Sequence, residues 1–222
     1  GAKSVKLTYL GDKEKLCTVG FTRQSQRQIK IWDPKMLSEP LKVEKIDQAA
    51  GVIIPYYDND TSVLYLAGKG DGNVRYYEIL PENPFLFKLS EYSSTTPAKG
   101  MAFIPKRGCN VMKCETARGL KLTSNAVEPL SFIVPRKSDA FQEDIFPPTF
   151  AGVPACTSDE WLDGIDKVPA KVSLDPNSDG SVIEAAASEE AAAPMMTRSA
   201  ALAYIDKLKE AMTAAGVEIP PP

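Results

Sequence analysis

The sequence predicts an all-β fold built from small antiparallel sheets, and a repeated hairpin pattern is the main reason. In residues 62–79, two β-rich segments flank the turn Lys69-Gly70-Asp71-Gly72. Glycine and aspartate tolerate the positive φ angles that tight hairpin turns require. Apolar residues occupy both faces of these segments, so we expect the hairpin to lie between two other sheets.

A second copy of this pattern lies upstream, where residues 16–21 and 28–33 flank a polar turn. Gly20 and Gly68 end equivalent strands, and their separation falls in the range of about 40–50 residues that four-stranded propeller blades show. The dipeptide Trp32-Asp33, which ends the first copy, is also typical of such blades. Because a small sheet cannot bury both faces alone, neighbouring blades stack and share a core. The repeat therefore predicts a partial β-propeller.

Four side chains are predicted to hold the blades together. Trp32 and Tyr77 occupy corresponding places in the two copies, where a bulky aromatic ring would fill the space between adjacent blades. Asp33 follows the first of these rings, and Asp71 lies in the central turn. We interpret all four as structural residues rather than binding residues.

The strands of about three blades follow in chain order. The first blade is predicted from four segments, residues 5–10, 16–21, 28–33 and 41–46. The second combines the central hairpin with residues 52–57 and 85–89. The third contains residues 100–105, 117–122 and 130–134, and no fourth strand follows it.

The remainder of the chain changes character. Residues 139–174 are proline-rich and irregular, although Thr157 and Glu160 form a capping-box pattern that predicts a short helix. Residues 198–215 predict a longer helix with a heptad seam, which includes Ile205, Leu208 and Met212. Two interpretations stay open for this helix, an oligomerising coiled coil and an amphipathic helix that docks on a protein surface.

Several segments together resemble one family. They are residues 66–78, 119–122, 134–139 and 141–149, with Glu160-Trp161-Leu162 further on. These segments are similar to those of coronin, the WD-repeat protein of the actin cytoskeleton, and the resemblance covers residues 1 to about 175. Generic WD repeats have neither residues 141–149 nor the later Glu-Trp-Leu motif.

The resemblance implies a domain organisation. Residues 1–135 would be the C-terminal blades of a seven-bladed WD-repeat propeller whose other blades lie upstream. Residues 136–174 would be an extension that packs on the propeller, residues 175–197 a linker, and residues 198–216 a helix that forms a short coiled coil.

It also implies a function: the protein would regulate the actin cytoskeleton by binding F-actin through its WD-repeat propeller and by scaffolding filament-turnover factors. The expected partners are F-actin, the actin-branching complex, cofilin and a second copy of the chain through the C-terminal helix. The expected location is the cytoplasm, at the actin-rich cortex. An alternative of another class is a generic WD-repeat adaptor for trafficking or signalling complexes.

Composition argues against several other functions. The chain has 222 residues and a formal net charge of −3, so no global basic field favours nucleic acid. No apolar run approaches the ~18 residues of a membrane span. There is no histidine, the usual general base for a serine or cysteine nucleophile, so we predict no enzyme and no cofactor.

Metal and nucleotide sites are not predicted either. The four cysteines, Cys17, Cys109, Cys114 and Cys156, are interpreted as free thiols of a cytosolic protein, the alternative being that Cys109 and Cys114 form half of a zinc site. The glycine-rich turn at residues 68–72 joins two strands, whereas phosphate-binding loops lead into a helix. Residues 58–60 lack the further oxygen ligands of a calcium loop.

Surface recognition remains, and an acidic filament requires cations on turns and loops. Six candidates follow from charge and position: Lys69, Arg75, Lys106, Arg107, Arg136 and Lys137. For Arg136 and Lys137 a structural role is the open alternative, in which the pair anchors the acidic residues 139–144.

Overall fold

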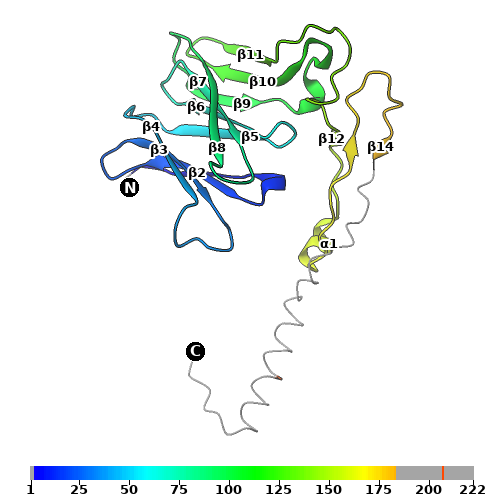
Figure 1. Ribbon diagram of the computed structural model, residues 1–222, viewed down its shortest axis with the longest axis horizontal. Coiled ribbons are helices and arrows are strands. Elements are labelled where there is room, and N and C mark those ends of the chain that lie inside the picture. Colours follow the sequence, from blue (N-terminus) through cyan, green and yellow to red (C-terminus); the bar gives the residue numbers. More distant parts are fainter. Residues whose placement is uncertain (1–2, 184–206, 208–222) are drawn as a thin grey trace. The chain divides into compact units, whose positions relative to one another are not determined.

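The structure, a computed structural model, describes residues 3–183 and 207 (Figure 1). The chain divides into two compact units. The larger unit comprises residues 1–149 and 174–178, and the smaller comprises residues 150–173 and 179–222.

The larger unit contains three antiparallel sheets. The first has the order β1 (Lys6–Tyr9), β2 (Leu16–Phe21), β3 (Arg27–Trp32) and β4 (Lys42–Asp47). The second has the order β5 (Ile53–Asp58), β6 (Val63–Gly68), β7 (Val74–Ile79) and β8 (Leu86–Tyr92). The third has the order β11 (Val127–Ile133), β10 (Glu115–Leu122) and β9 (Gly100–Phe103). Three 3-10 helices lie in the connections: η1 (Gly11–Lys13), η2 (Lys106–Gly108) and η3 (Val111–Lys113).

These sheets confirm the predicted all-β partial propeller. Each four-stranded sheet is formed by consecutive strands, so each hairpin brings its two strands into direct contact. The central turn has the expected geometry, because Gly70 adopts a φ of +92° that residues with a side chain rarely tolerate. Within the described residues, the third sheet has no fourth strand, as predicted.

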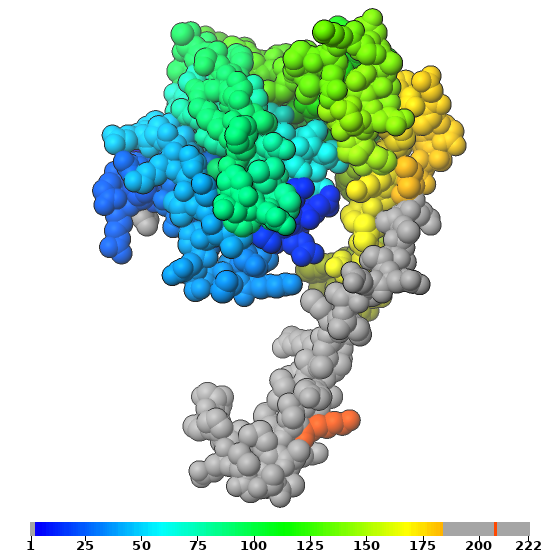
Figure 2. All heavy atoms as spheres, in the orientation of Figure 1, coloured from blue at the N-terminus to red at the C-terminus, as the bar shows by residue number. Residues whose placement is uncertain are grey.

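The central hairpin lies between the other two sheets, also as predicted (Figure 2). Side chains of β6 alternate between two cores because successive residues of a strand point to opposite faces. Leu64 and Leu66 enter the core shared with the first sheet. Tyr65 and Ala67 enter the core shared with the third sheet.

The two cores differ in composition. The core between the first and second sheets is mainly aliphatic and includes Val19, Ile29 and Ile79. The core between the second and third sheets is aromatic: the rings of Tyr56 and Phe103 stack with their centroids 4.1 Å apart. Aromatic rings provide large buried areas, so both interfaces stabilise the stack of sheets.

The first sheet has one face that no other described residues of the larger unit cover. Val5, Leu7 and Tyr9 are 57%, 61% and 55% exposed on or next to β1. Trp32 lies on this face, because it pairs with Leu16, which in turn pairs with Tyr9. The corresponding face of the second sheet carries Tyr77, which is covered and only 4% exposed.

The two aromatic residues therefore differ in surroundings. Tyr77 lies in the core between the first and second sheets. Trp32 is half-buried on the uncovered face, where its indole Nε1 donates a hydrogen bond of 2.8 Å to Thr18 Oγ1. Asp33, the other residue of the dipeptide, accepts a hydrogen bond from the backbone N–H of Lys35.

The smaller unit is described in part. The last small sheet joins β12 (Thr149–Phe150), β13 (Lys171–Val172) and β14 (Val182–Ile183), the last of which lies in the predicted linker. The predicted capping box is confirmed, because Thr157 and Glu160 cap the start of α1 (Ser158–Leu162) reciprocally. The predicted helix at 198–215, with Ile205, Leu208 and Met212, lies outside the described residues.

Candidate partner-binding surface

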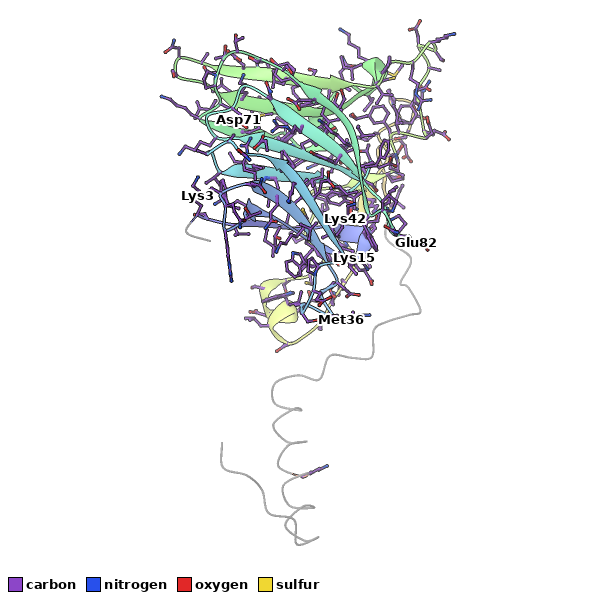
Figure 3. All side chains as sticks on the ribbon, turned by 60° about the vertical axis from the view of Figure 1, so that its left-hand side comes forward. Lys3, Lys15, Met36, Lys42, Asp71 and Glu82 are labelled. Atoms are coloured by element: carbon purple, nitrogen blue, oxygen red, sulfur yellow. The ribbon has the colours of Figure 1, made fainter. Side chains whose placement is uncertain are left out.

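The ends of the strands form two rims on the larger unit. One, here called the hairpin rim, carries the turns β2–β3, β6–β7 and β10–β11 together with the connections β4–β5 and β8–β9. Backbone hydrogen bonds join these segments: Lys69 N–H donates to Val52, and Ala98 N–H donates to Asp71. The other, here called the opposite rim, carries the remaining connections. In Figure 3, Lys3 and Asp71 mark the hairpin rim, and Lys15, Met36 and Glu82 mark the opposite rim.

A buried arginine connects the first two sheets at the hairpin rim. The Arg27 side chain, only 1% exposed, donates from Nε to Asp47 Oδ1 at 2.6 Å and from Nη2 to Asp47 Oδ2 at 2.5 Å. Its Nη2 also lies 2.7 Å from Asp71 Oδ2, in the central turn of the second sheet. Burial alone would lower the pKa of this guanidinium, but hydrogen bonds to the two carboxylates raise the pKa overall.

Arg75 extends this network. Its Nη2 lies 3.0 Å from Asp47 Oδ2, and its Nε lies 3.1 Å from Glu91 Oε2 on β8. Glu91 also accepts a hydrogen bond of 2.7 Å from Asn73 Nδ2. The hydrogen bond from Arg27 is the main reason that the pKa of Asp47 is lowered. Asp47 is therefore held ionised within an internal network.

A buried lysine makes the corresponding link between the second and third sheets. Lys121 on β10 is fully buried, and its Nζ donates to Ser94 Oγ at 3.1 Å. Its Nζ lies 3.8 Å from Glu128 Oε2 and 5.9 Å from the centroid of the Tyr92 ring. An ammonium group without water needs such partners, so Lys121 holds the sheets together rather than facing solvent.

These networks engage the carboxylates of the hairpin rim. In residues 3–6, 20–28, 45–53, 67–75, 90–101 and 120–129, the carboxylates are those of Asp47, Asp71, Glu91 and Glu128. Each is ion-paired with Arg27, Arg75 or Lys121. The exposed cations in these ranges are Lys6 and Lys45 on strands, and Arg23, Lys69 and Lys99 in turns or connections; no ion pair among the described residues includes them.

The opposite rim differs because it displays both signs of charge. Exposed carboxylates occur there at Asp12, Glu14, Glu82 and Glu143. Exposed cations lie among them, for example Lys35. Mixed charges of this kind give no strong field of either sign.

The six predicted contact residues divide between the rims. Lys69 and Arg75 belong to the hairpin rim, although Arg75 is occupied by the internal network. Arg107 and Lys137 are exposed on the opposite rim. Arg136 lies there too, with its Nη2 2.5 Å from Asp144 Oδ2, which is the anchoring role left open above.

Lys106 requires a correction, since a cation on a loop was expected to face solvent. Its side chain is 6% exposed, and its Nζ donates to Thr116 O at 2.5 Å and to Asp58 Oδ2. This buried pair links the second sheet to the connection after β9. Lys106 is therefore an internal link and not part of the surface.

Two hairpin-rim cations were missed, Arg23 and Lys99. Each lies in a polar segment between strands, a signal that the sequence does contain. Their significance depends on the neighbouring carboxylates being engaged elsewhere, and the sequence does not show that.

Other kinds of site find little support in the described part of the chain. Within residues 3–183, no group of three or more histidine, cysteine, aspartate or glutamate side chains could hold a metal ion. All four cysteines are free, and burial raises the pKa of the Cys17 thiol to about 12. Among the described residues, no helix is long and apolar enough to cross a membrane.

A pocket of about 280 Å³ lies next to the opposite rim. Its lining includes Lys13, Asp60, Glu78 and Ile145. Asp60 already accepts a hydrogen bond of 2.6 Å from Thr149 Oγ1.

The chain is similar to known proteins of one kind. Residues 127–169 match a family described as a type of WD40 repeat. Coronin-A of Dictyostelium discoideum is 52% identical over 162 residues, which cover 73% of this chain and 36% of that protein. Coronin-2A of Mus musculus is 47% identical over 181 residues, which cover 81% of this chain and 34% of that protein.

A solved structure agrees with these relatives. The WD40 domain of Toxoplasma gondii coronin is 35% identical and superposes with a TM-score of 0.74, covering 79% of this chain and 46% of that one. The chain spans about a third of the length of the curated relatives it matches.

Proposed function

The chain belongs to the coronin family, and we propose on that basis that it binds filamentous actin as part of a WD-repeat propeller. The observation that carries the proposal is the identity of 47–52% to coronins over most of the chain. The role is binding rather than catalysis. Because the chain spans only about a third of those relatives, the activity of the whole protein is part of the proposal.

The architecture suits a binding role. Stacked sheets hold their turns at fixed positions, and such scaffolds present recognition residues on rigidly placed loops. An acidic filament would be recognised by cations that are not already paired within the protein. The larger unit offers such cations, including Lys69 in the central turn.

We extend the proposal to the filament-turnover machinery. The actin-branching complex and cofilin are the proposed further partners, and the actin-rich cortex of the cytoplasm is the proposed location. We also propose that the chain oligomerises through the helix at 198–215. Further blades upstream of this chain would complete the propeller.

Co-sedimentation of the purified chain with F-actin tests the proposal. We expect the chain to pellet with filaments at low salt and to dissociate as salt rises, because exposed charges are screened beyond a Debye length of about 10 Å at 0.1 M. A control without actin measures self-pelleting.

A chain that melts cooperatively but stays in the supernatant at low salt would contradict actin binding. That result would favour the alternative, a WD-repeat adaptor for trafficking or signalling complexes.

A further inference from the structure

We infer that the hairpin rim, rather than the opposite rim, is the surface that contacts the acidic filament. This inference rests on the proposed function and assigns it to one side of the larger unit. The contact residues are Arg23, Lys69 and Lys99, two of which charge and position alone did not identify.

The first argument is that every carboxylate among the described residues of the hairpin rim is ion-paired, although the Glu128 side chain is 40% exposed. Asp47 and Asp71 are drawn inward by Arg27, and Glu91 is held by Arg75. A carboxylate that already neutralises a buried cation contributes little field at the surface. The exposed cations of the rim are therefore opposed by few exposed carboxylates.

The second argument is the placement of these cations along the stack. Arg23 lies in the β2–β3 turn of the first sheet, and Lys69 lies in the β6–β7 turn of the second. Lys99 lies beside the third sheet, where its backbone N–H donates to Leu122 O. Packed sheets are about 10 Å apart, so a row in which each sheet contributes one cation from a turn or connection can meet successive acidic groups of an extended partner surface.

The third argument is that the rim is held in place before any partner binds. Thr22 Oγ1 accepts hydrogen bonds from the backbone N–H groups of Gln24 and Gln26, which fix the turn that carries Arg23. The central turn packs so closely on the β8–β9 connection that a Cβ on Gly72 would lie 1.7 Å from Ser94 O. Preorganised contacts lose less conformational entropy on binding.

The opposite rim is less suited to contact an acidic partner. Asp12, Glu14 and Glu82 are exposed there and would repel an acidic partner. The cation Arg136 is already paired with Asp144.

Charge reversal on each rim tests the inference in the full chain. The first variant is R23E/K69E/K99E on the hairpin rim. The matched control is K35E/R107E/K137E on the opposite rim, which changes the net charge equally and also alters exposed cations without described ion pairs. Co-sedimentation with F-actin across a salt series measures binding, and thermal melting checks folding.

We expect the hairpin-rim variant to weaken binding at least about tenfold and the control to stay within about threefold of wild type. If the first variant does not fold, R23Q/K69Q/K99Q replaces it and should still weaken binding more than K35Q/R107Q/K137Q. Equal weakening of F-actin binding by the two variants, or a larger loss in the control, would overturn the rim assignment but not the proposed function. A folded wild-type chain that fails to bind would overturn the proposed function and the assignment with it.

Discussion

Replacing Arg27 with methionine should destabilise the larger unit strongly. The guanidinium is almost completely buried and contacts two carboxylates, Asp47 on its own sheet and Asp71 on the next. Methionine fills a similar volume but supplies no charge. The variant therefore leaves Asp71 Oδ2 buried without its cation, and it removes the strongest hydrogen bonds of Asp47.

The expected loss follows from the burial of the pair. Removing one partner of a buried ion pair costs about 3–5 kcal/mol, because the remaining charge is uncompensated. Arg75 lies 3.0 Å from Asp47 Oδ2 and 3.9 Å from Asp71 Oδ2, so it offsets part of this cost and the lower end of that range applies. A typical domain has only about 5–15 kcal/mol of stability, so even about 3 kcal/mol is a large fraction.

Urea unfolding followed by tryptophan fluorescence measures the effect, since Trp32 is on β3 together with Arg27. Lys88→Met is the control: its Nζ lies 3.7 Å from Glu91, but the side chain is 57% exposed, and such pairs contribute less than ~1 kcal/mol. Arg27→Lys should fall between the two, because lysine keeps the charge and loses the bidentate geometry. A loss for Arg27→Met no greater than that for Lys88→Met would refute the argument.

The remaining predictions concern acid stability, packing and association. Burial raises the pKa of Glu115, but hydrogen bonds from Arg118, Ser131 and the Asn110 N–H outweigh burial and hold the pKa at about 2, below the ordinary 4.5. The contribution of this carboxylate to the free energy of unfolding, about 3 kcal/mol, is complete above pH 4.5 and is lost as the pH falls toward 2. Glu115→Gln should therefore flatten the acid part of a curve of stability against pH measured by urea unfolding. Tyr77→Ala should cost about 3–5 kcal/mol in urea unfolding, whereas Trp32→Ala should cost less in this chain, where its face is uncovered; equal losses would contradict the assigned packing. The apolar face around Leu7, which is 61% exposed, should cause self-association that Leu7→Lys reduces in sedimentation velocity, and a wild-type monomer at all concentrations would contradict this.

Much of the fold could be predicted because strand signals are local. The turn with Gly70 and Asp71 lies between alternating β-rich segments, and the observed strands β6 and β7 follow those segments. The second copy upstream established the repeat, and a repeat implies stacked sheets. These inferences need only the period of the pattern and the conformational preferences of the turn.

The distribution of the charges could not be predicted in the same way. In β10, leucines and basic residues alternate, which suggests that Leu120 and Leu122 face the core and that Lys121 faces solvent. The structure shows the reverse for the last two: Lys121 is fully buried, and Leu122 is 46% exposed. The reason is that the aromatic core lies on the side of Ala117 and Lys121, so Leu122 points to the opposite face of the strand. Which face is covered depends on neighbouring sheets, and a strand pattern contains no such information.

The buried cations also connect stability with the proposed binding surface. Arg27, Arg75 and Lys121 join the sheets by engaging the carboxylates of the hairpin rim, and the same contacts leave Arg23, Lys69 and Lys99 as unpaired exposed cations there. Arg27→Met would therefore weaken filament binding in two ways, by loosening the stack and by removing the cation that neutralises much of the negative charge of Asp47 and Asp71 near the rim. Reversal of Arg23, Lys69 and Lys99 changes only the surface, because these side chains are exposed. We expect binding and stability to decline together in Arg27→Met, and binding alone to decline in the charge-reversal variant. That result would show that the rim acts through its charge and not merely through its shape.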